Sequence, residues 1–380
     1  MMQPAPNPHA EAHLTLVHGS ELLHACSAAV NAETLRSADP ERARIAFAWR
    51  LSAESREVLS YGWQLRESDD AVVGTLLDTE SGRKAVVLDA TLAGHKQPLS
   101  RAMFWDADHM VLPSSTRLKL LWDVRRDAEI LAYPESSGCW NTGFMLFRPS
   151  RLRRKEYERL LAATAEEARG RYRRGDRRCV VTKRCWRNPC QPNDQSYLNA
   201  VYSSKSGILQ RLRASGGGAG AVNAYAEANG MNRSVRGRYL PVPGSALRMR
   251  TSTRFGAQYG SRSCLVNVQQ LRRSDDTFHF YARLAPWRGA CAACALGGRR
   301  CSYASLPNFN AELGTDESGA AHTCGRAAAQ QIWFETLREK LPRRLRSLCL
   351  ARLEVATANA TGVCLDKGQL LTWPRRGARA

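Results

Sequence analysis

The stretch FWDADHMVL, residues 104–112, places two acidic side chains between two apolar runs. The first run reads as a buried strand, so Asp106 and Asp108 come at the point where that strand ends. In extended backbone, side chains two positions apart point the same way, and we expect both carboxylates to face one ion. Carboxylate oxygens suit Mg²⁺ or Mn²⁺, which leave room for a substrate's phosphate oxygens. The alternative is a solvated turn at a strand end, because Asp-x-Asp alone is common.

Strand-like and helix-like segments alternate on both sides of this motif. The strand-like runs are residues 14–17, 45–49, 85–88, 102–105, 130–133 and 144–147, and helix-like spacing covers 21–35 and 56–61. Ser52 is a candidate N-cap for the second helix. This alternation predicts an α/β fold with a doubly wound, mostly parallel central sheet. Ligands of such sheets bind beyond the carboxyl ends of the strands, where the acidic motif is expected.

The composition limits the class of protein. The 380 residues include 56 Lys and Arg against 35 Asp and Glu, a net charge of +21. This surplus favours contact with polyanions, which include nucleic acids, anionic lipids, phosphorylated substrates and acidic polysaccharides. The most basic segment, residues 151–187, has only three aromatic residues, Tyr157, Tyr172 and Trp186, and they do not mark a base-stacking surface, so there is no strong case for nucleic acid. No apolar run approaches the roughly 18 residues of a membrane-spanning helix.

The chain has twelve cysteines, and their number is informative about the cellular compartment of the protein. Most lie in two clusters, at positions 179, 185 and 190 and at positions 291, 294, 301 and 324. Disulfides, free thiols and a structural metal all remain open for them. The cysteine count and the sequons at Asn232 and Asn359 favour the Golgi or another secretory lumen, whereas residues 1–13 show no targeting segment, which would fit the cytoplasm.

The chain divides into three parts by pattern. We expect residues 1–12 to be a disordered N-terminal segment and residues 13–290 to form the main α/β domain. Residues 291–380 read as a small cysteine-containing C-terminal extension, with a helical stretch at 327–341 that Pro342 ends.

Three further blocks follow the acidic motif. They read CWNTGFMLFRPS (139–150), NDQSYLN (193–199) and FHFYARLAPW (278–287). In order and identity the four blocks resemble the retaining glycosyltransferases of family 8, the glycogenin and plant glycogenin-like group, over residues 13–290. The resemblance implies a GT-A-type fold and transfer of a hexose or related sugar from a UDP-sugar, with retention, to a carbohydrate, protein or lipid acceptor. It implies Mn²⁺ as the cofactor and leaves the oligomeric state open.

The resemblance also implies roles for individual residues. Asp106, Asp108 and His279 would hold the metal, and an imidazole ligand favours Mn²⁺ over Mg²⁺. Asp194 and Gln195 would lie beside the anomeric carbon, with Asp194 stabilising its oxocarbenium-like centre. The implied donor-binding residues are Leu16, His18, Glu135, Asn141, Thr142, Gly143, Arg283 and Trp287.

This chain departs from the family pattern in the last block. Ala282 replaces a glycine, and Ala285 stands where relatives have a lysine that contacts the donor diphosphate, a role Arg283 would have to take over. Losing such a cation costs transition-state stabilisation. The second hypothesis is therefore a catalytically weak or inactive glycosyltransferase-fold protein that binds a nucleotide-sugar or polysaccharide. A basic polyanion-binding module is the third.

Overall fold

The protein is described here by a computed structural model of the chain. The residues that the structure describes are 11–19, 21–67, 87, 99–112, 115, 117–124, 130–134, 140–149, 239–241, 249–251, 277–280, 300–301, 324–357, 362–366 and 369–373. Their principal helices and strands are β1 (Glu11–His18), α1 (Leu22–Ala38), β2 (Ala43–Trp49), α2 (Ala53–Ser60), β3 (Gln64–Glu67), β4 (Arg101–Trp105), β5 (His109–Val111), α5 (Leu118–Leu121), β6 (Ile130–Pro134), β7 (Trp140–Phe147), β8 (Tyr239–Pro241), β9 (Met249–Thr251), β10 (Thr277–His279), β11 (Arg300–Cys301), α14 (Cys324–Lys340), α15 (Arg343–Thr357), β12 (Gly362–Asp366) and β13 (Gln369–Trp373).

A seven-stranded sheet organises the fold, in the order β3-β2-β1-β4-β7-β6-β8. Every neighbouring pair is parallel except those of β7, which runs antiparallel to both β4 and β6. The strand order turns back at β1, which lies between β2 and β4. The predicted α/β class with a doubly wound, mostly parallel sheet is therefore confirmed. Two smaller sheets, β5-β10-β9 and β11-β12-β13, accompany it.

The central strands are buried because both faces of the sheet are covered. β4 is buried along its whole length, and β1 is buried except for partial exposure of Leu16 and His18. Continuous apolar runs are the usual sequence of parallel strands in this setting. The predicted cap of α2 is confirmed: the Ser52 hydroxyl oxygen accepts the Ser55 N–H at 3.1 Å.

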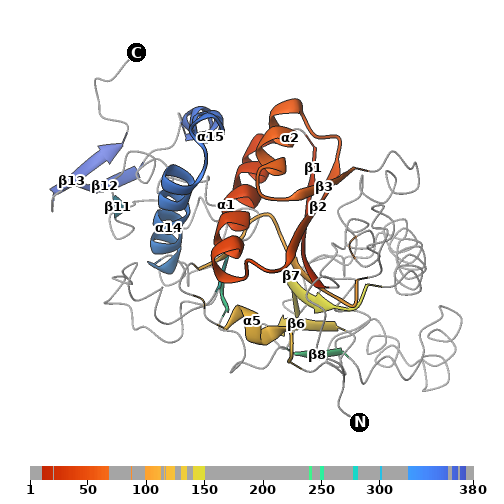
Figure 1. Cartoon of the computed structure of the whole chain (residues 1–380). Helices are drawn as coiled ribbons and strands as arrows, with labels where there is room; N and C mark the ends of the chain where they lie inside the picture. The colour runs from red at the N-terminus through yellow and green to blue at the C-terminus, as the bar shows by residue number, and fades with distance from the viewer. Residues whose placement is uncertain are drawn as a thin grey trace, which may run out of the picture.

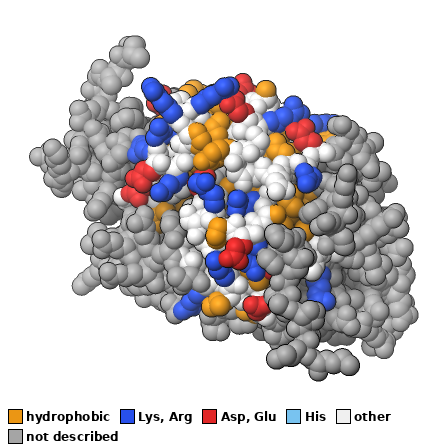
Figure 2. Space-filling model, in the orientation of Figure 1, with side chains coloured by type: hydrophobic (Ala, Val, Ile, Leu, Met, Phe, Trp, Pro, Cys, Tyr) orange, Lys and Arg blue, Asp and Glu red, His pale blue; other side chains and the backbone are white. Residues whose placement is uncertain are grey.

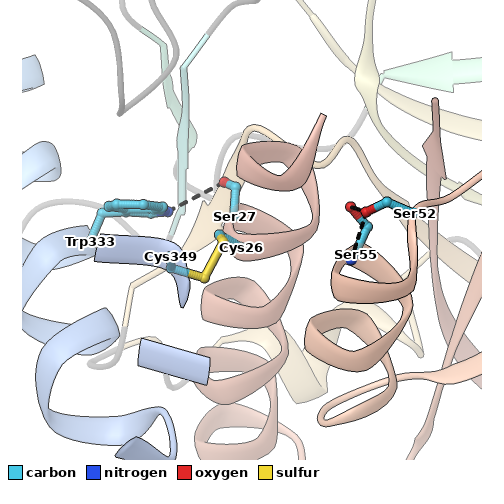
Figure 3. The surroundings of a disulfide bond; sticks show 6 residues. All are labelled: Cys26, Ser27, Ser52, Ser55, Trp333 and Cys349. Atoms are coloured by element: carbon cyan, nitrogen blue, oxygen red, sulfur yellow. Dashed lines mark hydrogen bonds between the residues drawn. A yellow bond between two sulfur atoms is a disulfide. The ribbon is translucent and has the colours of Figure 1, made fainter. Parts of the chain in front are cut away.

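Helix α1 lies between the sheet and the C-terminal helices α14 and α15 (Figure 1). Because it is covered on both sides, α1 is buried on nearly all its faces rather than on one stripe. A disulfide joins Cys26 of α1 to Cys349 of α15, and the Trp333 indole N–H donates to the Ser27 hydroxyl at 3.3 Å (Figure 3). The described helices of the C-terminal extension thus share one hydrophobic core with the α/β domain.

Several boundaries differ from those expected. β1 begins at Glu11, two residues before the expected start of the domain, and β7 begins at Trp140 rather than at 144. Pro342 does end α14, but a second helix, α15, follows immediately, and the Pro342 carbonyl accepts its Arg346 N–H at 2.9 Å. The sequence favours this because proline is tolerated at the start of a helix.

The surface of the described residues is mixed in charge. On the face drawn in Figure 2, their Lys and Arg side chains lie among acidic and apolar ones. None of the helices in the described ranges is long and apolar enough to cross a bilayer.

Candidate functional site

The carboxyl ends of the parallel strands β1, β2 and β4 meet at one edge of the sheet. The chain leaves β1 through Gly19, whose φ is +78° and whose N–H donates to the Trp49 carbonyl of β2 at 2.9 Å. It leaves β2 through Arg50, which has a φ of +52°. Positive φ at a residue other than glycine is strained, and such strain is common at functional sites. The donor-binding candidates Leu16 and His18 lie in the last three residues of strand β1, at this edge, and are partly buried.

The acidic motif forms a turn at the same edge. The Asp106 carbonyl accepts the His109 N–H at 2.9 Å, after which β5 begins. The prediction of extended backbone through Asp106 and Asp108 is therefore wrong. The chain turns because β4 belongs to the central sheet, whereas β5 pairs with β10 in a separate one. Both carboxylates remain partly exposed at the turn.

Strand β7 contacts the first residue of this acidic turn, residues 106–109. The Asp106 N–H donates to the Gly143 carbonyl at 2.9 Å. Asn141, Thr142 and Gly143 all belong to β7, and Thr142 is only 2% exposed. The block expected to bind the donor sugar therefore lies directly beside the first acidic residue.

Strand β10 contacts the other end of the turn. The Phe280 N–H donates to the Asp108 carbonyl at 2.9 Å, and His279 pairs with His109 in the antiparallel register of β10 and β5. The backbone of His279 thus lies beside the acidic turn, while its side chain is outside the described residues. Three segments that are far apart in the sequence, 105–109, 141–143 and 277–280, meet here.

The chemistry of these residues fits a divalent cation. Two partly exposed carboxylates on one short turn supply the hard oxygen donors that Mn²⁺ and Mg²⁺ prefer. Among the described side chains, no group of three His, Cys, Asp or Glu residues could hold a metal by itself. A third protein ligand would therefore have to be a side chain outside the described ones, and the expected ligand, the His279 imidazole, is such a side chain.

A buried polar network underlies the turn. The Trp105 indole N–H donates to Nδ1 of His13 at 3.1 Å, and Nε2 of His13 lies 3.0 Å from Oδ2 of Asp39. The Trp122 indole N–H donates to the same Asp39 oxygen at 2.7 Å, and Arg42 donates to Oδ1 at 2.9 Å. The side chains of His13 and Asp39 are fully buried. Buried polar groups this well paired hold their neighbours in one arrangement.

These bonds fix the protonation of the network. Because Nδ1 of His13 accepts from Trp105, the ring proton is on Nε2, which donates to Asp39. Burial lowers the pKa of His13 below its usual 6.5, so the ring is neutral despite the nearby carboxylate. Burial alone would raise the pKa of Asp39, but hydrogen bonds from His13 and Trp122 and the charge of Arg42 lower it to about 2.

Several predicted site residues lie outside the described residues. They are Glu135, Asp194, Gln195, Arg283 and Trp287. Sequence reasoning in turn missed His13, Asp39 and Thr15, whose hydroxyl donates to the Trp105 carbonyl at 2.8 Å. For His13 and Thr15 the available signal was two polar side chains at alternate positions among the apolar residues of a buried strand.

No protein-family model and no curated protein matches the chain. Among solved structures, the galactosyltransferase LgtC, in complex with donor and acceptor sugar analogs, is 12% identical, with 89% of this chain and 99% of that chain covered and a TM-score of 0.44. The glycosyltransferase GlyE of Streptococcus pneumoniae TIGR4 is 12% identical over 73% of this chain and 57% of its own, with a TM-score of 0.40. Mouse xyloside xylosyltransferase 1 is 12% identical over 72% of this chain and 99% of its own, with a TM-score of 0.37. Because the identities are only 12%, the chemistry of this protein must be inferred from its own side chains.

Proposed function

We propose that the protein is a retaining glycosyltransferase that moves a hexose or related sugar from a UDP-sugar to a carbohydrate, protein or lipid acceptor. The observation that carries the proposal is the meeting of three sequence blocks at one edge of the sheet. The Asp106 N–H bonds to Gly143 and the Phe280 N–H bonds to Asp108, so blocks that resemble those of family 8 in residue identity and sequence order are also adjacent in space. The site lies beyond the carboxyl ends of β1 and β4, where the strand order turns back.

The acidic turn is the proposed metal site. Asp106 and Asp108 would bind Mn²⁺ through carboxylate oxygens, with His279 as the third protein ligand. Mn²⁺ accepts mixed oxygen and imidazole ligands better than Mg²⁺ does. The bound cation supplies charge neutralisation for a diphosphate leaving group.

The remaining residues would bind and orient the donor. Leu16 and His18, at the end of β1, would contact the uridine, and Asn141, Thr142 and Gly143 would line the sugar pocket. The rest of the proposed set lies outside the described residues: Glu135 at the sugar hydroxyls, Arg283 at the diphosphate, Trp287 as a further donor-binding residue, and Asp194 with Gln195 beside the anomeric carbon. A carboxylate at that carbon stabilises the positive charge that develops there.

The test is a donor panel with two readouts. We expect UDP with Mn²⁺ to raise the melting temperature, because a ligand that binds only the folded state stabilises it. We expect at least one UDP-sugar to release UDP in the presence of Mn²⁺ and a suitable acceptor, or slowly by hydrolysis. Absence of both the thermal shift and UDP release across the panel would overturn the proposal.

A nucleotide-sugar-binding protein without turnover is the second candidate. Ala285, which stands in place of the expected diphosphate-binding lysine, favours it. This candidate predicts the thermal shift with UDP and Mn²⁺ but no UDP release from any donor. Release by the Ala285→Lys variant alone would indicate a weakened enzyme rather than a binding protein.

The compartment we propose is the Golgi or another oxidising secretory lumen. The Cys26–Cys349 disulfide joins two fully buried side chains, and such bonds persist in oxidising compartments. The test is the redox state of these two cysteines in protein isolated from its source with thiols blocked. Recovery of both as free thiols would contradict the assignment.

A further inference from the structure

We propose that His13 is a positioning residue for the acidic turn, acting through its hydrogen bond to Trp105. The inference rests on the proposed metal-binding role of Asp106 and Asp108. It assigns a purpose to a buried polar network that the sequence motifs do not include.

Trp105 is the last residue of β4 and directly precedes Asp106. Strand β1 holds it at two points: Thr15 donates to its carbonyl at 2.8 Å, and His13 accepts from its indole N–H at 3.1 Å. The ring is also packed between aromatic neighbours, with centroids 4.7 Å from Phe144 and 5.0 Å from His109. The residue that leads into the turn is therefore fixed in both backbone and side chain.

His13 is itself held in one orientation. Its Nε2 is paired with Asp39, which follows the C-terminus of α1 and also accepts from Trp122 and Arg42. Arg42 in turn donates to Glu11 at 3.0 Å and lies 4.8 Å from the centre of the Trp122 ring. A ring anchored in this way presents Nδ1 to Trp105 in a single direction.

The turn begins at the residue that directly follows this anchored tryptophan. Its first N–H reaches Gly143, and the turn closes through the His109 N–H to the Asp106 carbonyl. Its far end is held by the Phe280 N–H. Rotation of the Trp105 indole would shift the start of the turn and change the spacing of the two carboxylates. Binding sites lose affinity when the residues that orient the ligands are removed, typically by about 10- to 100-fold for a metal site.

Two substitutions of His13 separate its two bonds. The amide oxygen of Asn occupies nearly the place of Nδ1, so His13→Asn keeps an acceptor for Trp105 and loses the bond to Asp39. The amide nitrogen of Gln occupies nearly the place of Nε2, so His13→Gln keeps the donor to Asp39 and leaves the Trp105 N–H without an acceptor. Each variant loses one buried hydrogen bond, and we expect similar falls in melting temperature.

The first readout is amide hydrogen exchange of the metal-free protein at Asp106, His109 and Phe280, the three donors of the turn. We expect these amides to exchange about tenfold faster in His13→Gln than in His13→Asn, with amides of α2 alike in both. The second readout is Mn²⁺ affinity, from the electron paramagnetic resonance signal of free Mn²⁺. We expect affinity about tenfold weaker in His13→Gln and within about twofold of the parent protein in His13→Asn.

The two proposals fail in different ways. Equal exchange of the three amides in both variants would overturn the positioning role, whatever the protein does with Mn²⁺. A parent protein that binds no Mn²⁺, with exchange still split between the variants, would overturn the metal-binding function and leave the positioning role intact. If either His13 variant does not fold, Trp105→Phe and Trp122→Phe form the equivalent pair, since each removes one indole N–H from the network and only Trp105 adjoins the turn. Equal effects of that pair on the three amides would also overturn the positioning role.

Discussion

The Phe280 N–H donates a 2.9 Å hydrogen bond to the carbonyl of Asp108, although the two residues are far apart in the sequence. This bond, with the pairing of His279 and His109, brings the late histidine block to the acidic turn. If the turn is a metal site, its ligands are assembled by the fold as a whole and not by one local motif.

Removing one acidic side chain from the turn tests its role directly. We expect Asp108→Asn to abolish the rise in melting temperature caused by UDP with Mn²⁺ and to lower metal-dependent UDP release at least 100-fold, because the amide lacks the ligand charge. The unliganded melting temperature should change little, since Asp108 is partly exposed. Glu354→Gln, an exposed charge change on α15, is the matched control and should behave as the parent protein. A normal rate in Asp108→Asn would remove this residue from the mechanism.

We expect the disulfide between Cys26 and Cys349 to contribute much of the stability of the packing of α15 against α1. We expect the Cys26→Ala, Cys349→Ala double variant to lose about 2–5 kcal/mol of stability, because the bond closes a long loop in the unfolded chain. Urea unfolding with and without a reductant measures the effect. The reductant should destabilise the parent protein more than the double variant, and equal sensitivity of the two proteins would contradict this assignment.

The buried His13–Asp39 pair predicts loss of stability in acid. The pKa of His13 is lowered in the folded protein, so below pH 6.5 the unfolded chain binds a proton that the folded one does not, and stability falls. The pKa of Asp39 is lowered from 3.8 to about 2, so a further contribution, on the order of 2 kcal/mol, is lost as the pH falls through that interval.

Melting temperature measured against pH checks both steps. Asp39→Asn should remove the lower step, although it also weakens the network at neutral pH. Melting temperatures that stay constant from pH 7 to pH 2 would show that neither group is linked to folding as proposed.

Gly62 marks a close approach between the end of α2 and helix α1. A Cβ at position 62 would lie 2.4 Å from Cβ of Ala32, so Gly62→Ala should cost about 1–3 kcal/mol. Adding Ala32→Gly should recover part of that loss, and thermal unfolding of the two single variants and the double variant gives the coupling. Gly19→Ala is the comparison: its Cβ would meet nothing within 4 Å, and the cost is only that of its positive φ. An equal loss in both single variants, with no rescue, would rule out the contact with Ala32.

Local patterns in the sequence predicted much of the fold. The Ser52 cap, the alternation of strands and helices and the acidic residues after β4 all follow from spacing and residue type. The reversed direction of β7 does not, because the apolar run 144–147 has the same character in either direction. The turn at Asp106 was only the alternative interpretation for a similar reason: it exists because β5 joins another sheet, which is a property of the tertiary structure.

The buried polar network of His13, Asp39 and Trp105 could not be predicted from the sequence for a different reason. His13 was visible as a polar residue in a buried strand, but its partner Asp39 lies beyond α1 and its other partner, Trp105, on a different strand. Only the assembled sheet brings the three together. The Cys26–Cys349 pair is similar, because twelve cysteines allow many pairings and only the packing of α15 on α1 selects this one.

Helix α1 is covered on its outer side by α14 and α15, which are synthesised much later than α1 because Cys26 and Cys349 are 323 residues apart. A ribosome-bound chain that has not yet released α15 therefore leaves Cys26 and its apolar neighbours open to solvent. Until α15 has been synthesised, chaperones must shield these residues, and the Cys26 thiol must avoid wrong partners among the cysteines made before Cys349.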